Sequence, residues 1–357
     1  MFDFLSPKIS AFGIDLSDWS IKIANLEKRD GKIFLVSFGR QEIKEGLIEE
    51  GEIKNEEELL KTIETAIQNI KGKKIRTKYC IVSLPETISF VQVLSLPLME
   101  EKEVAEAIKW ELEAHIPLPL EEIYFDWRII SCPETPNPKS LKVLVGALPK
   151  KTVDPYLSVL SKVGLKPVAF EIESVATVRA LIKNNLPGES VMILDLGAKR
   201  TSLAIASSRA VYFTTSLPIS NYSFAKTLSQ ELKITFEKAY QLKITEGLGD
   251  LDKPSKIFQA LKPALLDLVQ KIKEYMEFYH EHGVSESESK NQISKIILCG
   301  GGANLGGLSQ FLADELALEV AVGQPLAGIE IPKNSLGFNE SLAFTTALGL
   351  ALENPNH

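Results

Sequence analysis

The sequence has little cysteine and no long apolar run. Its three cysteines, Cys80, Cys132 and Cys299, are odd in number and far apart, which argues against a disulfide framework and against a cysteine-based metal site. No apolar run approaches the roughly 18 residues of a membrane-spanning helix. The opening residues MFDFLSPKIS lack the basic end and apolar stretch of a signal peptide. We therefore expect a cytoplasmic protein that does not insert into a membrane and reaches one only through a partner.

The sequence also lacks an excess of positive charge. It has 40 Lys and Arg against 47 Asp and Glu, a formal net charge of -7, and no block of consecutive basic residues. This charge gives no electrostatic footprint for nucleic acid and disfavours binding to an anionic membrane surface. A chain of 357 residues with 45% hydrophobic content is long enough for two cores of ordinary domain size. We expect a globular protein of two domains without a nucleic-acid partner.

An acidic turn between two apolar strands occurs twice. Residues 12–28, FGIDLSDWSIKIANLEK, read as two strands separated by a turn that carries Asp15, Ser17 and Ser20. Residues 190–206, SVMILDLGAKRTSLAIA, repeat the pattern around Asp195. Either turn alone is more often an ordinary polar hairpin than a site for a phosphate and its cation. The recurrence is more informative, because it indicates a duplicated architecture with two facing turns.

A run of three glycines follows a later strand. In ISKIILCGGGANLGGLSQFLADEL, Gly300, Gly301 and Gly302 lie between an apolar strand and an amphipathic helix. Glycines here let a backbone approach a ligand closely and aim helix-terminal amides at it, although such a turn is as often a packing device. The spacing fits neither a Rossmann fingerprint nor a P-loop.

The remaining pattern predicts alternating strands and helices. The predicted strands are 11–16, 20–27, 33–38, 78–85, 88–96, 123–130, 140–148, 166–172, two within 190–206, 210–219 and the ISKIILC segment before the three glycines. The predicted helices are 56–70, 100–115, 151–163, 174–184, 222–232, 236–246, 255–282, 305–316 and a C-terminal one. Asn55 with Glu58 is predicted to cap the first of these helices, and Ser174 to cap the helix at 174–184. The aromatic residues Trp110, Phe125 and Trp127 are interpreted as core of the unit that follows residue 88, with a partner groove as the alternative.

Two acidic turns and then a glycine-rich strand-to-helix turn, in this order, resemble the phosphate 1, phosphate 2 and adenosine motifs of the actin, Hsp70 and sugar-kinase superfamily. The resemblance implies an α/β, actin-like ATPase fold, with two duplicated RNase H-like domains around a nucleotide cleft. It implies ATP and Mg²⁺ as cofactors, with the metal held on the carboxylate side by Asp15 and Asp195. The other nucleotide-binding residues that it implies are Ser17, Ser20, Lys22, Gly197, Thr201, Lys243, Gly300, Gly301 and Gly302.

Within this superfamily the chain resembles the PilM family of type IV pilus assembly, and more distantly FtsA. The resemblance rests on FGIDLSDWSIKIANL, on LSLPLMEEKEVAEAIKWELEAHIPLPLEEIYFDW, on MILDLGAKRTSLAI, on LKITFEKAYQLK and on CGGGANLGGLSQFLADEL. It implies a first domain over 1–187 with a small α+β subdomain inserted at about 88–170, a second domain over 188–338, and a C-terminal helix at 339–352 that packs on the first domain.

The same resemblance implies an adaptor at the inner face of the cytoplasmic membrane. Its partner would be the cytoplasmic N-terminal peptide of a PilN-like membrane protein, and ATP would modulate the angle between the domains. Three alternatives stay open: a small-molecule kinase, an ATPase, and an FtsA-like protein that self-associates into filaments.

The chain departs from the family pattern at three places of the expected site. One is LPISNYSFAKTL, where Ser220 and Asn221 stand in place of Gly-Gly after the second-domain hairpin. Ser17 replaces the glycine of the Asp-x-Gly turn, which places a Cβ where the backbone would contact phosphate. Tyr240 stands where an acidic residue is usual, although Lys243 is retained. We therefore expect nucleotide binding with weak or absent hydrolysis.

Overall fold

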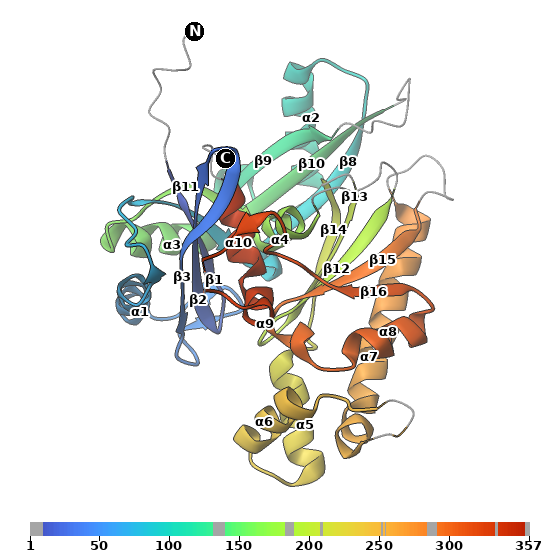
Figure 1. Ribbon diagram of the computed structural model, residues 1–357. Coiled ribbons are helices and arrows are strands. Elements are labelled where there is room, and N and C mark those ends of the chain that lie inside the picture. Colours follow the sequence, from blue (N-terminus) through green and yellow to red (C-terminus); the bar gives the residue numbers. More distant parts are fainter. Residues whose placement is uncertain are drawn as a thin grey trace.

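The computed structural model describes residues 10–130, 140–182, 189–207, 210–250, 253, 255–283, 291–332 and 335–353. These residues form two large sheets, a three-stranded sheet and a two-stranded ribbon, with helices packed on and between the large sheets (Figure 1). Cys132 and the predicted boundary at 187/188 lie outside the described residues. No helix within them combines the length and apolar character needed to cross a membrane.

The first sheet has the strand order β11-β7-β1-β2-β3-β17, with β6 paired to β3. Its strands are β1 (Phe12–Leu16), β2 (Ser20–Arg29), β3 (Lys32–Glu42), β6 (Lys71–Gly72), β7 (Tyr79–Leu84), β11 (Lys166–Ile172) and β17 (Ile329–Glu330). Alternation along β1 places Phe12, Ile14 and Leu16 in a core with α1 (Glu56–Gln68) and α3 (Lys150–Lys162). The Asn55 side chain caps α1 by accepting from the Glu58 N–H, as the sequence predicts.

The opposite face of the first sheet packs against α10 (Thr345–Leu352). Gly13 of β1 allows this close approach, because a Cβ at that position would overlap the Ala347 carbonyl and the Ala351 nitrogen. The C-terminal helix therefore lies on the first domain. It also contacts α4 (Glu173–Leu181), where a Cβ at Gly349 would overlap the backbone of Ala176.

The second sheet has the order β14-β13-β12-β15-β16. Its strands are β12 (Ser190–Leu196), β13 (Thr201–Ser207), β14 (Ala210–Leu217), β15 (Ile293–Cys299) and β16 (Glu319–Val322). One face forms the largest core with α5 (Asn221–Leu232), α6 (Phe236–Glu246), α7 (Lys256–His282) and α8 (Leu308–Leu316). The other face packs against Val178 and Ile182 at the C-terminal end of α4, so α4 lies between the two sheets (Figure 1).

The two large sheets repeat one topology. In each, an antiparallel three-strand meander is followed by a strand parallel to its first member: β7 beside β1, and β15 beside β12. Each first strand therefore ends at the acidic turn of its own copy. The sequence predicts this duplication, and the strand pairing confirms it.

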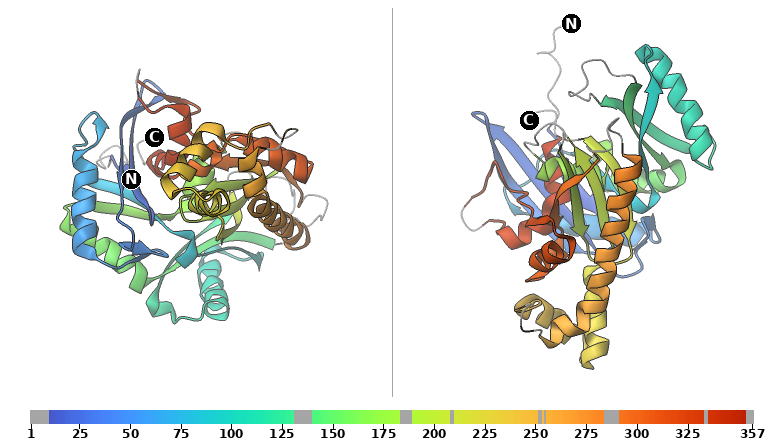
Figure 2. Two further views of the ribbon diagram at one scale, coloured as in Figure 1. Left: turned by 90° about the horizontal axis from the view of Figure 1, so that it is seen from below. Right: turned by 90° about the vertical axis from the view of Figure 1, so that its right-hand side faces the viewer.

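The inserted subdomain is the three-stranded sheet β8-β10-β9 with one helix. It comprises β8 (Phe90–Pro97), α2 (Glu101–His115), β9 (Ile123–Ile130) and β10 (Ser140–Pro149), and it projects from the rest of the molecule (Figure 2). The sequence pattern predicts that this unit extends to about residue 170. In the structure α3 and β11 belong to the first sheet and its core, because β11 pairs in parallel with β7.

Two local predictions are wrong. The Trp110 side chain on α2 is 72% exposed, whereas Phe125 and Trp127 pack against the subdomain core as expected. Ser174 does not cap α4, which begins at Glu173 after Ile172.

Short elements complete the chain. They are β4 (Ile48–Glu49), β5 (Glu52–Ile53), η2 (Glu86–Ile88), η3 (Leu120–Glu122), η5 (Gly301–Asn304), α9 (Phe338–Ser341) and η6 (Leu342–Phe344).

Candidate functional site

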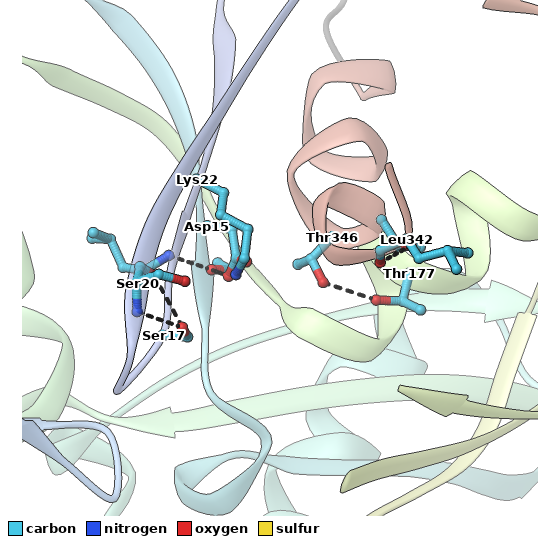
Figure 3. Close-up of polar contacts among 10 residues, drawn as sticks. Asp15, Ser17, Ser20, Lys22, Thr177, Leu342 and Thr346 are labelled. Carbon is cyan, nitrogen blue, oxygen red and sulfur yellow. Dashed lines mark hydrogen bonds and ion pairs between the residues drawn. The ribbon is translucent and has the colours of Figure 1, made fainter. Parts of the chain in front are cut away.

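The first acidic turn is held by a network within the first sheet. Asp15 and Lys22 are opposite each other in the β1–β2 ladder, and the Lys22 ammonium donates to Asp15 Oδ2 at 2.8 Å (Figure 3). The Ser83 hydroxyl of β7 donates to Asp15 Oδ1 at 3.0 Å. Asp15 is only 4% exposed, so the hydrogen bonds and the ion pair fix the carboxylate at the end of β1.

The tip of this turn is closed by two serines. The Ser17 hydroxyl donates to the Ser20 carbonyl at 3.0 Å and accepts from the Ser20 N–H at 3.2 Å (Figure 3). The Asp18 carboxylate accepts from the N–H groups of Glu50 and Gly51. Burial raises the pKa of Asp18, and these two N–H donors offset part of that rise. Asp18 therefore ties the first acidic turn to the turn at residues 50 and 51.

The second acidic turn lies beside the glycine-rich turn. Asp195 of β12 pairs in register with Cys299, the last residue of β15. Gly300 has φ +79°, and a Cβ there would overlap the Asp195 carboxylate. A Cβ at Gly197 would overlap the Arg200 carbonyl. The absence of a Cβ at Gly300 therefore lets the two turns fit together, and its absence at Gly197 lets the second acidic turn close on itself.

Both acidic turns line one cavity of about 460 Å³ between the two large sheets. Residues 15 and 195 are 180 positions apart, and the fold brings them to the same cavity. Of the residues predicted from the sequence, those that line it are Asp15, Ser17, Ser20, Lys22, Asp195, Gly197, Lys243, Gly300 and Gly301.

Two predicted residues do not line this cavity. Thr201 is fully buried, and its hydroxyl donates to the Ile219 carbonyl at 2.7 Å. Ser202 lines the cavity instead, because successive residues of a strand face opposite sides. Gly302 is buried against β12, where a Cβ would overlap Leu196, so this glycine serves packing.

The cavity concentrates negative charge at its inner end. Burial and the nearby Asp15 carboxylate raise the pKa of Asp195 to about 6. Burial, with repulsion from Asp15, Asp195 and Glu86, raises the pKa of Glu173 well above its usual value. Lys22 opposes both shifts. Removal of these carboxylates from water is unfavourable unless a cation accompanies them.

Glu173 is a cavity residue that the sequence analysis missed. It is the first residue of α4 and lines the cavity together with the two predicted aspartates. The signal was its position directly after strand β11, at the carboxyl edge of the first sheet, where ligands of open α/β sheets bind. Assignment of β11 to the inserted subdomain concealed that signal.

An aromatic wall was also missed. Trp19 of the first turn lies 6.1 Å from the ring of Tyr222 on α5, measured between centroids. Tyr222 is 4.8 Å from Phe236, which stacks on Tyr240 at 6.3 Å. All four rings line the cavity. Because Trp19 belongs to the first domain and Tyr222 to the second, their contact crosses the cleft.

Lys243 lies at the far end of this aromatic wall. Its ammonium is 4.8 Å from the centroid of the Tyr240 ring and donates to the Asn221 carbonyl at 2.8 Å. Burial lowers the pKa of Lys243 to about 8. The lysine is thus a partly desolvated cation on the second-domain side of the cavity.

The donor set suits a hydrated cation rather than an all-protein metal cage. Among the described residues, no group of three or more His, Cys, Asp or Glu side chains is arranged to hold a metal ion. Mg²⁺ usually keeps several waters and binds one or two carboxylates together with substrate phosphates. Asp15, which is buried, and the half-buried Asp195, whose pKa the Asp15 carboxylate helps to raise, fit that pattern. The absence of a Cβ at Gly300 makes room for the Asp195 carboxylate.

A family model and a solved structure both relate this chain to PilM. The family model described as type IV pilus assembly protein PilM matches residues 13–355. The fold is similar to a structure of a PilM-PilN type IV pilus biogenesis complex, with a TM-score of 0.80, 23% identity, and coverage of 98% of this chain and 99% of that chain.

Two other solved structures share the fold at lower similarity. One is the ethanolamine utilization protein EutJ from Carboxydothermus hydrogenoformans, with a TM-score of 0.56, 15% identity, and coverage of 96% of this chain and 89% of that chain. The other is MreB5 of Spiroplasma citri bound to ADP, with a TM-score of 0.51, 14% identity, and coverage of 94% and 95%. The predicted actin-like ATPase fold is thereby confirmed.

Proposed function

The chain belongs to the family of the type IV pilus assembly protein PilM, and on that basis we propose that it is a nucleotide-binding adaptor in type IV pilus assembly. One observation carries the nucleotide part of this proposal: two acidic turns from the two duplicated domains line a single cavity with a glycine-rich turn. Nucleotide phosphates with a hydrated Mg²⁺ would relieve the repulsion among the buried carboxylates there.

Each side chain of the cavity has a distinct role in this proposal. Asp15 and Asp195 would hold Mg²⁺, and Lys22 with the hydroxyls of Ser17 and Ser20 would contact phosphate oxygens. The bound metal would supply charge neutralisation between the carboxylates and the phosphates. Gly197, Gly300 and Gly301 allow the backbone to approach the nucleotide, and Lys243 lies at the second-domain end of the cavity.

Nucleotide binding would change the angle between the domains. Contacts that cross the cleft include the Trp19–Tyr222 ring pair and the ion pair between Arg200 and Glu50, 2.8 Å long. A ligand that draws Asp15 and Asp195 together alters these contacts, and the inserted subdomain moves with the first domain. The affinity for a partner that contacts both parts then depends on nucleotide.

The partner we propose is the short cytoplasmic N-terminal peptide of a PilN-like membrane protein. The similar fold of the PilM-PilN complex supports this choice. Binding to such a peptide would locate the chain at the inner face of the cytoplasmic membrane.

Calorimetry tests both parts of the proposal. The purified chain is titrated with the PilN-like peptide, with and without ATP and Mg²⁺, and Asp195→Ala serves as the nucleotide-site control. We expect the wild type to bind the peptide with a nucleotide-dependent affinity, and the variant to bind it with an affinity that ATP does not change. Absence of peptide binding would contradict the adaptor function, and an unchanged ATP affinity in the variant would contradict the site.

A second candidate function, ATP hydrolysis, is favoured by the position of Glu173. Its raised pKa and its place beside the two aspartates suit a general base that orients a water molecule. If the chain is an ATPase, Glu173→Gln should reduce turnover by about 100-fold or more while ATP affinity changes little. Phosphate release by the wild type that persists in the variant would exclude this role.

A further inference from the structure

A second cavity, of about 600 Å³, adjoins the proposed nucleotide site. One wall is the segment where the chain leaves the first sheet for the inserted subdomain, including Glu86, Phe90 and Val91. The facing wall is β14 of the second domain, from Thr214 to Ser216. The Glu50–Arg200 ion pair lies at its rim. The cavity therefore takes its walls from both domains and from the insertion.

Buried polar atoms in this wall lack partners. Glu86 is 7% exposed, and neither of its carboxylate oxygens makes a hydrogen bond to the described residues. The Ser216 hydroxyl oxygen is buried and unbonded in the same way. Burial raises the pKa of Glu86, and the neighbouring groups of Thr214 and Ser174 offset only part of that rise. A buried carboxylate without a donor or counter-ion is costly to the fold.

Among the described residues that line this cavity there are acceptors but no unpaired cation. Arg200, the cationic residue that lines this cavity, is already paired with Glu50. Lys22 lies on the nucleotide side and is paired with Asp15. The carboxylate that faces Glu86 from α4 is Glu173, and their repulsion contributes to the raised pKa of Glu173. The missing component is thus a positively charged hydrogen-bond donor.

We propose that this second cavity binds an alkylammonium or alkylguanidinium group, with Glu86 as its counter-ion. The hydroxyl groups of Ser216 and Thr214 accept from the same group, and Phe90 and Val91 contact its aliphatic stem. The ligand is either a free alkylamine or a Lys or Arg side chain of a bound partner segment. Only the second source depends on the proposed adaptor function.

The second cavity is positioned to influence the nucleotide site. Glu86, Thr87, Arg200 and Ser216 line both cavities. A cation that neutralises Glu86 removes one source of repulsion on Glu173. The two cavities are therefore coupled through these four shared residues.

The first arm of the test uses butylguanidinium as the probe and neutral butylurea as its matched analogue. Calorimetry on the full chain should show binding of butylguanidinium, with butylurea at least about tenfold weaker, because a hydrogen bond to a charged group contributes more than a neutral one. Glu86→Gln should weaken butylguanidinium by about tenfold or more, and Ser216→Ala by about fivefold. Glu315→Gln, an exposed carboxylate of α8, is the control and should change nothing.

Loss of folding would not explain weaker binding of butylguanidinium by Glu86→Gln. Glu86→Gln removes a buried charge, so its melting temperature should equal or exceed that of the wild type. Affinity for butylguanidinium should also rise as pH increases through the pKa of Glu86, because the ionised form binds. Equal binding of the two probes, or equal affinity in wild type and Glu86→Gln, would overturn the proposal.

The second arm separates the two sources. Each Lys or Arg of the PilN-like peptide is changed to Gln in turn. The loss of peptide affinity is then measured for the wild-type chain and for the Glu86→Gln chain. A coupled loss identifies the partner side chain, whereas additive effects assign the cavity to a free alkylamine. If the peptide does not bind at all, the adaptor proposal fails, while the butylguanidinium arm still decides the cavity.

Discussion

Lys22 stands directly opposite Asp15 in the β1–β2 ladder, with its ammonium 2.8 Å from Asp15 Oδ2. Their side chains are only 12% and 6% exposed. This register explains the spacing of seven residues between the aspartate and the lysine. In a hairpin with a two-residue loop Lys22 would not pair with Asp15, whereas in the observed hairpin it does. Lys22 is the internal counter-ion of a cavity with an excess of carboxylates.

Loss of this counter-ion should destabilise the protein. Lys22→Met leaves the buried Asp15 carboxylate without its ion pair, so we expect the free energy of unfolding to fall by about 2 to 4 kcal/mol at neutral pH. The double variant Asp15→Asn with Lys22→Met should recover most of that loss, because no buried charge is left unpaired. Urea unfolding of the wild type, both single variants and the double variant measures the coupling. Additive effects would show that the pair contributes nothing.

Asp195 should make stability depend on pH. Its pKa is about 6 in the folded chain and near 3.8 when unfolded, so the folded state holds the proton more tightly. The contribution of Asp195 to the stability of the wild type should therefore decrease as pH rises from about 4 to about 6 and stay level above that range.

Asp195→Asn should remove this dependence. Relative to the wild type, the variant should gain about 2 to 3 kcal/mol above pH 6 and nothing below pH 4, from a shift of about two pKa units. Urea unfolding without nucleotide across this pH range is the measurement. A difference that is constant with pH would show that Asp195 does not titrate there.

Ser17 should limit nucleotide affinity. Its Cβ lies in the turn where the family pattern has glycine, so Ser17→Gly should tighten ATP binding several-fold, at a stability cost of about 1 kcal/mol from backbone entropy. Ser17→Ala is the matched control: it keeps the Cβ and loses the hydroxyl, with its bonds to Ser20 and its proposed phosphate contact. Calorimetry with ATP and Mg²⁺ separates the two. Equal tightening in both variants would assign the effect to the hydroxyl instead.

The local patterns of the sequence were sufficient to predict the site's two acidic turns. Asp15 and Asp195 each follow a strongly apolar strand, and the recurrence of that pattern indicated that the turns face each other. The prediction for Thr201 was wrong by one residue, because Ser202 faces the cavity and Thr201 faces the core. The length of the preceding turn decides which residues of a strand face which side, and the composition of the strand does not reveal that length.

Long-range pairing accounts for the other differences. β11 joins the first sheet through parallel pairing with β7, across the whole inserted subdomain, and a short strand pattern carries no information about its distant neighbour. The misplacement of β11 also hid Glu173. Trp110 was expected in a core because it is large and apolar, but the buried stripe of α2 consists of Val104, Ile108 and Leu112, and position 110 lies outside that stripe.

The ring contact between Trp19 and Tyr222 should favour the closed arrangement of the domains. Aromatic pairs contribute about 0.5 to 1.5 kcal/mol beyond their buried area, and this pair joins the first acidic turn to α5 across the cleft. Trp19→Ala should therefore weaken ATP binding by about fivefold, because a smaller fraction of the free protein is in the binding arrangement. Trp110→Ala, at a tryptophan 72% exposed on the inserted subdomain, is the control and should leave ATP affinity unchanged.

In a variant with Trp110 and Trp127 changed to Phe, the emission of Trp19 should respond to ATP with Mg²⁺, since the domain angle alters its contact with Tyr222. If that emission does not change while calorimetry shows nucleotide bound, the domains do not move at this contact, and the coupling between nucleotide and partner must act through another path.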